Sequence, residues 1–259
     1  MPFLATPNCM LYYDVFEPDV EAARANEAET VLLLHGFGGT PESDFAGQLP
    51  ELRQRYRVVA PHLHGYGKSS QRSRYPVSYY RDDVVDVIAL LDALAIERVL
   101  ALAFSDGAIT SLLLAALYPE RVGKLAAMGA QNSINVENVA AIRHWLLERP
   151  LSEEWQEELA RLHGEPYWRT LPRMYVEAQV ALVEAGGVLI TDEELAAIRC
   201  PTLIMHGVRD RVVPADYARY IHAHIPGSQL LLFDAGHAAH LRCQEEYTEA
   251  VMRFFKSQR

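Results

Sequence analysis

The chain has 259 residues, of which 50% are hydrophobic and 22% are charged, and it carries a formal net charge of −10 at pH 7. This length can bury a large core, and the composition excludes disordered, collagen-like and coiled-coil proteins. The acidic balance, without any basic run, argues against nucleic acid as a partner. The sequence shows neither a run of about 18 apolar residues nor a signal-peptide pattern. We therefore expect a cytoplasmic protein without a membrane partner.

Short apolar runs predict a mostly parallel sheet. A run at 11–16 predicts an antiparallel edge strand. Runs that are apolar on both faces are typical of buried parallel strands. Six such runs occur, at 31–34, 56–60, 98–104, 125–128, 202–205 and 229–233. Because helical patterns alternate with them, the sequence predicts an α/β fold with helices on both faces of the sheet.

The helical patterns of the first half have recognisable starts. Ser43 is predicted to cap a helix that runs through Arg55, and Ser78 to cap a second one. The predicted buried face of the second helix holds Val84, Val85, Ile88, Leu91 and Leu94. Residues 106–118 are apolar nearly all round, which predicts a buried helix that Pro119 ends.

The alternation stops between residues 132 and 198, where only helical patterns occur. They cover 136–148, 152–163 and 166–185, and a fourth, short helix is predicted from the capping pair Thr191 and Glu194. We therefore predict a core formed by 1–131 and 199–259, with 132–198 as a helical cap over the strand ends.

The predicted cap is acidic and rich in tryptophan. It holds 12 Asp and Glu against 5 Arg, a net charge of −7. This charge lies either on solvated helix faces or around a site entrance, where it would favour cationic substrates. Trp145, Trp155 and Trp168 all lie in the cap, where they either line a substrate pocket or pack within the cap.

The pentapeptide Ala103-Phe104-Ser105-Asp106-Gly107 lies between a predicted buried strand and a predicted buried helix. In that setting the Gly-x-Ser-x-Gly pattern forms a nucleophile elbow, which lifts the serine hydroxyl clear of the sheet. Ala103 replaces the first glycine and adds only a methyl group. Ser105 is therefore the candidate nucleophile.

A serine nucleophile needs a base, and the base needs an orienting acid. Asp210 follows one predicted strand and His237 follows the next, which gives the chain order Ser, Asp, His of α/β hydrolases. All three lie past carboxyl ends of strands, where open α/β sheets bind ligands. Asp234 competes for the role of acid, and His240 for that of base.

A glycine-rich turn, His35-Gly36-Phe37-Gly38-Gly39, follows an earlier predicted strand. Such a turn can direct a backbone N–H at a developing oxyanion. The N–H groups of Phe37 and Asp106 are the predicted oxyanion donors, and Gly38 is an alternative to Phe37.

These motifs resemble the α/β-hydrolase superfamily over nearly the whole chain. Within it, SDGAITSLLLAALYP, HGVRDRVVP and AGHAAHLR are most similar to the valacyclovir hydrolase, or biphenyl hydrolase-like, group. The resemblance implies that Ser105 is the nucleophile, Asp210 the acid and His237 the base. It also implies that Asp106 binds the α-ammonium group of amino-acid esters. His62-Leu63-His64-Gly65 departs from the Asp-x-Arg-Gly turn of many relatives.

The charge of the Asp106 side chain also affects the proposed reaction. A carboxylate about 5 Å from a developing oxyanion opposes it by about 3 kcal/mol at an effective dielectric of about 20. A cationic substrate would neutralise Asp106; alternatively, Asp106 forms a local salt bridge or uses only its N–H.

We thus expect a serine hydrolase that cleaves carboxylic esters, preferably α-amino-acid esters, through an acyl-enzyme. Three alternatives remain: an aminopeptidase of the proline iminopeptidase kind, a carbon–carbon bond hydrolase, and a non-catalytic ligand-binding member of the fold. No cofactor is expected. No metal is expected either, because the cysteines Cys9, Cys200 and Cys243 are widely spaced and odd in number.

Overall fold

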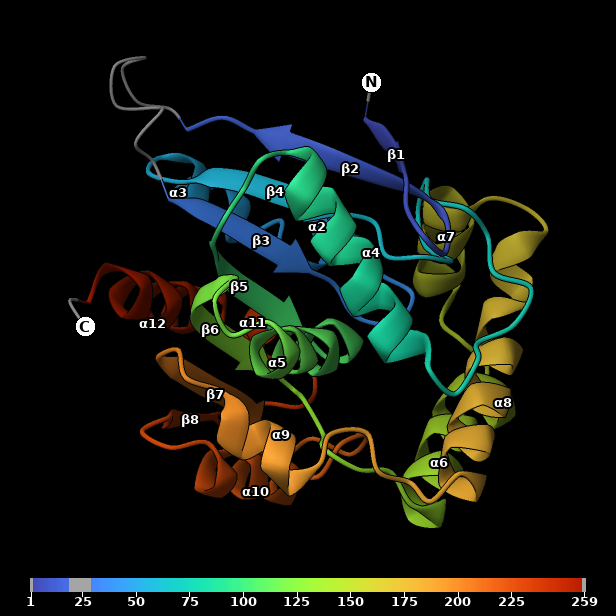
Figure 1. Ribbon diagram of the computed structural model, residues 1–259. Helices are drawn as coiled ribbons and strands as arrows, with labels where there is room; N and C mark the ends of the chain where they lie inside the picture. The colour runs from blue at the N-terminus through green and yellow to red at the C-terminus, as the bar shows by residue number, and fades with distance from the viewer. Residues whose placement is uncertain (1, 19–28, 258–259) are drawn as a thin grey trace.

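The computed structural model describes residues 2–18 and 29–257. Within them one sheet has the strand order β1-β2-β4-β3-β5-β6-β7-β8, with β1 and β2 antiparallel and the others parallel (Figure 1). The strand bounds are β1 Phe3–Ala5, β2 Met10–Phe16, β3 Thr30–Leu34, β4 Arg57–Pro61, β5 Val99–Phe104, β6 Val122–Met128, β7 Thr202–Gly207 and β8 Gln229–Phe233.

The six predicted parallel strands and the predicted antiparallel strand are confirmed. The strand β1, which is only three residues long, was not predicted. The predicted burial of β8 is wrong, since Phe233 is the one buried residue of this strand. β8 is an edge strand with β7 as its only neighbour in the sheet, so its side chains are covered less completely.

Helices lie on both faces of the sheet and beyond its carboxyl edge. Their bounds are α2 Pro41–Asp44, α3 Leu49–Arg53, α4 Tyr79–Ala93, α5 Asp106–Leu117, α6 Val136–Arg143, α7 Glu153–His163, α8 Leu171–Glu184, α9 Asp192–Ala197, α10 Asp216–His224, α11 Ala239–Arg242 and α12 Gln244–Lys256. A π-helical segment, His144–Glu148, continues α6, and a 3₁₀ turn, Tyr167–Arg169, precedes α8. No helix in the described ranges is both long and apolar enough to cross a membrane.

The helix predicted from Ser43 to Arg55 is two short helices, α2 and α3. Thr40, not Ser43, caps α2, and Ser43 is the third helical residue of a capping box: its Oγ accepts a hydrogen bond from Thr40 N at 2.9 Å. Pro50 has no N–H to continue a helix, so α3 starts anew beside it.

The start of α4 at Ser78 is as predicted, but its buried face differs. Ser78 makes no side-chain cap, and Val85 is 39% exposed, whereas the carboxylates of Asp83 and Asp86 are buried. Hydrophobic periodicity could not reveal this, because each carboxylate is held by a partner from another segment. Arg72 pairs with Asp83, and Asn8 binds Asp86.

Two hydrophobic clusters cover the two faces of the sheet. One packs Leu32 and Leu34 against α4, α5 and α10, and the other packs Val31 and Leu33 against α3 and α12. α5 is buried nearly all round, as its sequence predicts.

The helices α6, α7 and α8 lie together beyond the carboxyl ends of β3 and β5 (right side of Figure 1). Two backbone links join the segments that enter and leave this group, a bridge between Ser133 and Val188 and bonds from Leu189 N and Ile190 N to Asn132 O. α9, inside the predicted cap range, packs against α5 and α10. The division into core and cap therefore stays a prediction.

Candidate active site

Ser105 stands on a sharp turn between β5 and α5. Its φ of 52° and ψ of −118° are values that a non-glycine residue rarely adopts. Its N–H donates to Met128 O at 2.8 Å, which holds the turn against β6. At Gly107 a Cβ would lie 2.2 Å from Leu34 O, so α5 can approach β3 this closely only with glycine there. The turn therefore has the geometry of a nucleophile elbow.

Three side chains from three strand ends form one hydrogen-bonded chain. His237 Nε2 lies 2.9 Å from Ser105 Oγ, and His237 Nδ1 lies 2.6 Å from Asp210 Oδ2. The Asp210 side chain is fully buried and that of His237 is 17% exposed. The structure thus brings together the three residues that the sequence singled out.

Asp210 accepts three hydrogen bonds and also lies close to the imidazole of His206. Its Oδ1 accepts from the N–H groups of Val212 and Val213 at 2.8 and 2.9 Å. Its Oδ2 accepts from His237 and lies 3.2 Å from His206 Nε2. Burial alone would raise the pKa of Asp210, but the hydrogen bonds from His206 and His237 and the backbone hold that pKa well below its usual range. The carboxylate is therefore ionised and fixed in place.

His206 had no role in the sequence analysis, although its position at the end of β7 was visible. It is completely buried, and its Nε2 also lies 2.9 Å from Val213 O. Only the folded turn brings it to Asp210, four residues further on.

The competing residues lie elsewhere. Asp234 is 79% exposed and pairs with Arg209. His240 is buried against the ring of Phe104, at a centroid distance of 4.1 Å, and neither ring nitrogen has a hydrogen-bond partner in the described part of the chain. Burial lowers the pKa of His240 to about 3, so it is neutral at pH 7.

The candidate oxyanion donors face the same space as Ser105. Phe37, Gly38 and Asp106 all line the pocket that contains Ser105 and His237. Within the described residues, the N–H groups of all three make no hydrogen bond. The geometry leaves these donors free, and it does not choose between Phe37 and Gly38.

This pocket has a volume of about 360 Å³ and contains carboxylates that the sequence analysis did not place there. Asp44 Oδ2 accepts from Gly36 N at 2.8 Å, which ties α2 to the glycine-rich turn. Burial raises the pKa of Asp44 to about 7, against the hydrogen bond from Gly36. Glu158, from α7, lines the same pocket. Neither residue follows a strand directly, so no motif marked them.

Of the three tryptophans in the predicted cap, two line the pocket and the third packs outside it. Trp145 and Trp155 line the pocket and stack on one another, with ring centroids 5.0 Å apart. Trp168 is buried outside it, with the Arg169 guanidinium 4.4 Å from its ring centroid. Tyr175 also lines the pocket, whereas the Tyr167 hydroxyl bonds to Gly65 O.

The two carboxylate oxygens of Asp106 differ in their hydrogen bonds. Its Oδ1 accepts hydrogen bonds from the hydroxyls of Tyr80 and Tyr175, each at 2.8 Å. Its Oδ2 is buried and has no hydrogen-bond partner among the described residues. Burial raises the pKa of Asp106 to about 6, although the two tyrosine hydrogen bonds oppose the shift. The predicted alternative of a local salt bridge is wrong, because the partners are neutral hydroxyls.

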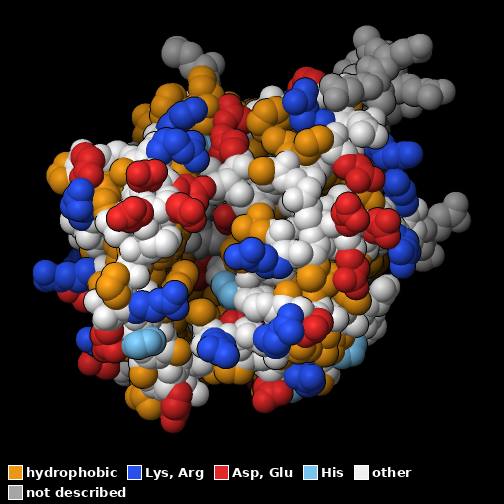
Figure 2. All heavy atoms as spheres, turned by 180° about the vertical axis from the view of Figure 1, so that it is seen from behind, with side chains coloured by type: hydrophobic (Ala, Val, Ile, Leu, Met, Phe, Trp, Pro, Cys, Tyr) orange, Lys and Arg blue, Asp and Glu red, His pale blue; other side chains and the backbone are white. Residues whose placement is uncertain are grey.

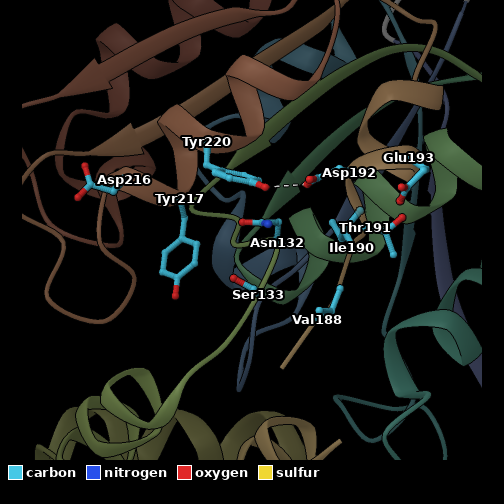
Figure 3. Close-up of a pocket in the computed structure, with 10 residues that line it drawn as sticks. All are labelled: Asn132, Ser133, Val188, Ile190, Thr191, Asp192, Glu193, Asp216, Tyr217 and Tyr220. Carbon is cyan, nitrogen blue, oxygen red and sulfur yellow. Dashed lines mark hydrogen bonds between the residues drawn. The ribbon is translucent and has the colours of Figure 1, made fainter. Parts of the chain in front are cut away.

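A larger, more open groove of about 610 Å³ lies between α9 and α10 (Figure 3). Asn132 and Ser133 are among the residues that line it, and Tyr220 donates a hydrogen bond to Asp192. It contains no histidine to activate Ser133. The chemistry-bearing residues therefore mark the smaller pocket as the candidate active site.

Comparisons with known proteins agree with this geometry. A family model described as "alpha/beta hydrolase fold" matches residues 29–171. The chain belongs to the α/β-hydrolase family. The human "Serine hydrolase BPHL" is 33% identical to this α/β hydrolase over 235 residues, which cover 87% of this chain and 79% of the relative. This confirms the resemblance to the biphenyl hydrolase-like group.

Two other relatives carry names of a different reaction. A 2-hydroxy-6-oxo-2,4-heptadienoate hydrolase of Pseudomonas putida is 27% identical to this α/β hydrolase, over 88% of this chain and 89% of the relative. A solved structure of 2-hydroxy-6-oxo-6-phenylhexa-2,4-dienoate hydrolase from Rhodococcus superposes with a TM-score of 0.81 at 24% identity. That match covers 99% of this chain and 98% of the other. At this identity the superposition shows the fold alone.

Proposed function

We propose that the protein is a serine hydrolase that cleaves carboxylic esters through an acyl-enzyme. The observation that carries this proposal is the chain from Asp210 through His237 to Ser105, with links of 2.6 and 2.9 Å. It ends on a serine that stands in a strained turn and lines a pocket. A 33% identical relative named as a serine hydrolase supports it.

In the proposed mechanism His237 carries protons in both half-reactions, and Asp210 supports it. His237 Nε2 takes the Ser105 proton as Oγ attacks the ester carbonyl, and Asp210 stabilises the imidazolium that forms. The N–H groups of Phe37 and Asp106 hold the oxyanion. His237 then gives its proton to the leaving alcohol, and water attacks the acyl-enzyme by the same route in reverse.

We further propose that the substrate is an α-amino-acid ester whose ammonium group binds Asp106. The buried Oδ2 of Asp106 has no partner, and an unpaired buried carboxylate oxygen is costly. An ammonium group would donate to that oxygen and neutralise the charge beside the oxyanion. Glu158 adds negative charge to the same pocket, and Asp44, with its pKa raised to about 7, adds charge only when it is ionised.

Carbon–carbon bond hydrolysis is the second candidate, because the Pseudomonas putida relative carries a dienoate hydrolase name. A dienoate substrate is anionic, and the carboxylates of Asp106 and Glu158 in this pocket would repel it. An aminopeptidase of the iminopeptidase kind shares the triad and the cation site, so a panel of amino esters, aminoacyl amides and dienoates separates all three. A non-catalytic member would turn over none of them.

Some acidic groups of the predicted cap form ion pairs on exposed helix faces, such as Glu165 with Arg169 and Glu177 with Arg173. The face seen in Figure 2 likewise mixes acidic and basic side chains. We therefore assign the preference for a cation to Asp106 and Glu158, which line the pocket, rather than to the exposed charges of 132–198. A cytoplasmic location is proposed on the three unpaired cysteines.

Replacing Asp106 by asparagine is expected to lower kcat/KM for an α-amino aryl ester by about tenfold to a hundredfold, the range for a lost charge-assisted hydrogen bond. The N-acetylated ester, which carries no cation, should not lose activity. In the wild type the ratio of kcat/KM for the two esters should fall as the pH drops through about 6, where Asp106 becomes protonated. Steady-state kinetics on both esters between pH 5 and 8 measure this ratio, in which effects of His237 cancel.

Glu158→Gln serves as the matched control, since Glu158 lines the same pocket without lying beside Ser105. Its effect on the ratio should be smaller than that of Asp106→Asn. An unchanged ratio in Asp106→Asn would refute the ammonium site while leaving the serine mechanism standing.

A further inference from the structure

Three metal-binding side chain types meet outside the active-site pocket. The Sγ of Cys9, a ring nitrogen of His64 and a carboxylate oxygen of Asp86 all lie within 4.8 Å of one another. Cys9 lies just before β2, His64 follows β4, and Asp86 lies in α4. The fold therefore assembles a Cys/His/Asp group from three distant segments. Cysteine spacing alone, which predicted no metal motif, could not reveal it.

Asp86 is oriented toward this group and lacks a cationic partner. The residue is only 1% exposed. Its Oδ1 accepts from the backbone N and the Nδ2 of Asn8, each at 3.1 Å, and its Oδ2 accepts only the weak hydrogen bond from the thiol of Cys9, at 3.7 Å among the described residues. In the described part of the chain no lysine, arginine or histidine forms an ion pair with Asp86. Buried carboxylates are usually paired with a cation or bound to a metal ion.

His64 also has unused bonding capacity. Its Nδ1 is buried and makes no hydrogen bond within the described residues. Arg72 lies close by and bonds to the carbonyl of His64, but its guanidinium is paired with the buried carboxylate of Asp83. The positive charge of Arg72 is therefore already compensated by Asp83.

We propose that Cys9, His64 and Asp86 bind one zinc ion, with water as the fourth ligand. In a tetrahedral zinc site, with Zn–S of about 2.3 Å and Zn–O of about 2.0 Å, sulfur and oxygen lie about 3.5 Å apart. The Cys9–Asp86 separation of 3.7 Å is close to this. As the Zn–S bond forms, the thiol proton leaves to solvent. A sulfur ligand favours zinc over magnesium or calcium, which prefer oxygen ligands.

A second group, Asp14, Glu42 and His62, meets the same distance limit but contains a histidine without a free ring nitrogen among the described residues. His62 Nδ1 accepts from Lys68 N at 3.1 Å, and its Nε2 lies 3.2 Å from a Glu42 carboxylate oxygen. Both ring nitrogens of His62 are thus used. The zinc is therefore assigned to Cys9, His64 and Asp86, where it would tie the β1–β2 connection to α4 and to the turn after β4.

The test uses Co²⁺, which substitutes for zinc and gives a near-ultraviolet charge-transfer band when a thiolate is a ligand. Metal-free full-length protein titrated with Co²⁺ should develop this band at one equivalent, and Zn²⁺ should abolish it. Cys9→Ser should lose the band, and His64→Gln should bind at least about tenfold more weakly. Cys243→Ser is the matched control and should behave as the wild type, since Cys243 is half-buried and lies outside the group.

Further measurements distinguish loss of the metal site from misfolding of the variant. Circular dichroism of Cys9→Ser should match the wild type, and its ester hydrolysis should be unchanged, because Cys9 lies outside the pocket. Zn²⁺ should raise the Tm of the wild type and not that of Cys9→Ser. The proposal is overturned if the wild type gives no thiolate band. It is also overturned if the band survives in Cys9→Ser, disappears in Cys243→Ser, or keeps full affinity in His64→Gln.

Discussion

Replacing Ser105 by alanine should lower kcat for a small aryl ester by about 10⁴-fold to 10⁶-fold, because the attacking oxygen is lost. The fold should be unaffected. Alanine and serine tolerate a positive φ equally poorly, so the strained turn costs the same in both proteins. Initial rates and thermal unfolding followed by circular dichroism measure the two effects separately.

Ser133→Ala is the matched control, since Ser133 lines the larger groove and has no histidine beside it there. It should retain wild-type activity. If Ser105→Ala kept activity within tenfold of the wild type, Ser105 would not be the nucleophile, and the proposed function would fail with it.

Replacing Asp210 by asparagine should have the second-largest effect, a loss of about 10⁴-fold in kcat at neutral pH. An asparagine NH₂ group directed at His237 Nδ1 would force the proton onto Nε2, the nitrogen that must accept the Ser105 proton. The substitution also removes the negative charge that stabilises the imidazolium. A pH–rate profile of the variant should show the activity partly recovering at alkaline pH, where deprotonation of the serine no longer depends on His237.

Asp234→Asn is the control for this change, because Asp234 ends the neighbouring strand but is exposed and pairs with Arg209. It should behave as the wild type. Equal losses in the two variants, or a larger loss in Asp234→Asn, would reverse the assignment of the acid.

Asp210 should also contribute to stability in a defined pH range. Its folded-state pKa lies well below its unfolded value, so its contribution is fully present above the unfolded value of about 4. The contribution is lost as the pH falls toward the folded-state pKa. The difference in unfolding free energy between the wild type and Asp210→Asn should therefore shrink below about pH 4.

Site residues could be predicted from the sequence where a reactive side chain lies close after a predicted strand. The close approach of Ser105, Asp210 and His237 could be predicted because each lies in the turn after an apolar run, and the ends of parallel strands meet at one edge of a sheet. Asp44 and His206 could not, because their roles depend on a turn and a buried contact that bring them to Gly36 and Asp210.

The burial of charged side chains could not be predicted from the local sequence either. Periodicity places apolar residues inside, so it gave no reason to bury Asp86, Asp83 or Asp106. Each is buried because a distant segment supplies a partner: Asn8, Arg72, or the hydroxyls of Tyr80 and Tyr175. Pairing across segments is a property of the fold and leaves no pattern in the local sequence.

Covalent labelling tests the central claim most directly. A fluorophosphonate forms a stable adduct only with an activated serine, so one equivalent should add to the wild type and map to the peptide that carries Ser105. Ser105→Ala should remain unlabelled, and Asp210→Asn should label much more slowly. An adduct on any other residue, or none at all in the folded wild-type protein, would contradict the proposal that Ser105, His237 and Asp210 act together as a serine hydrolase.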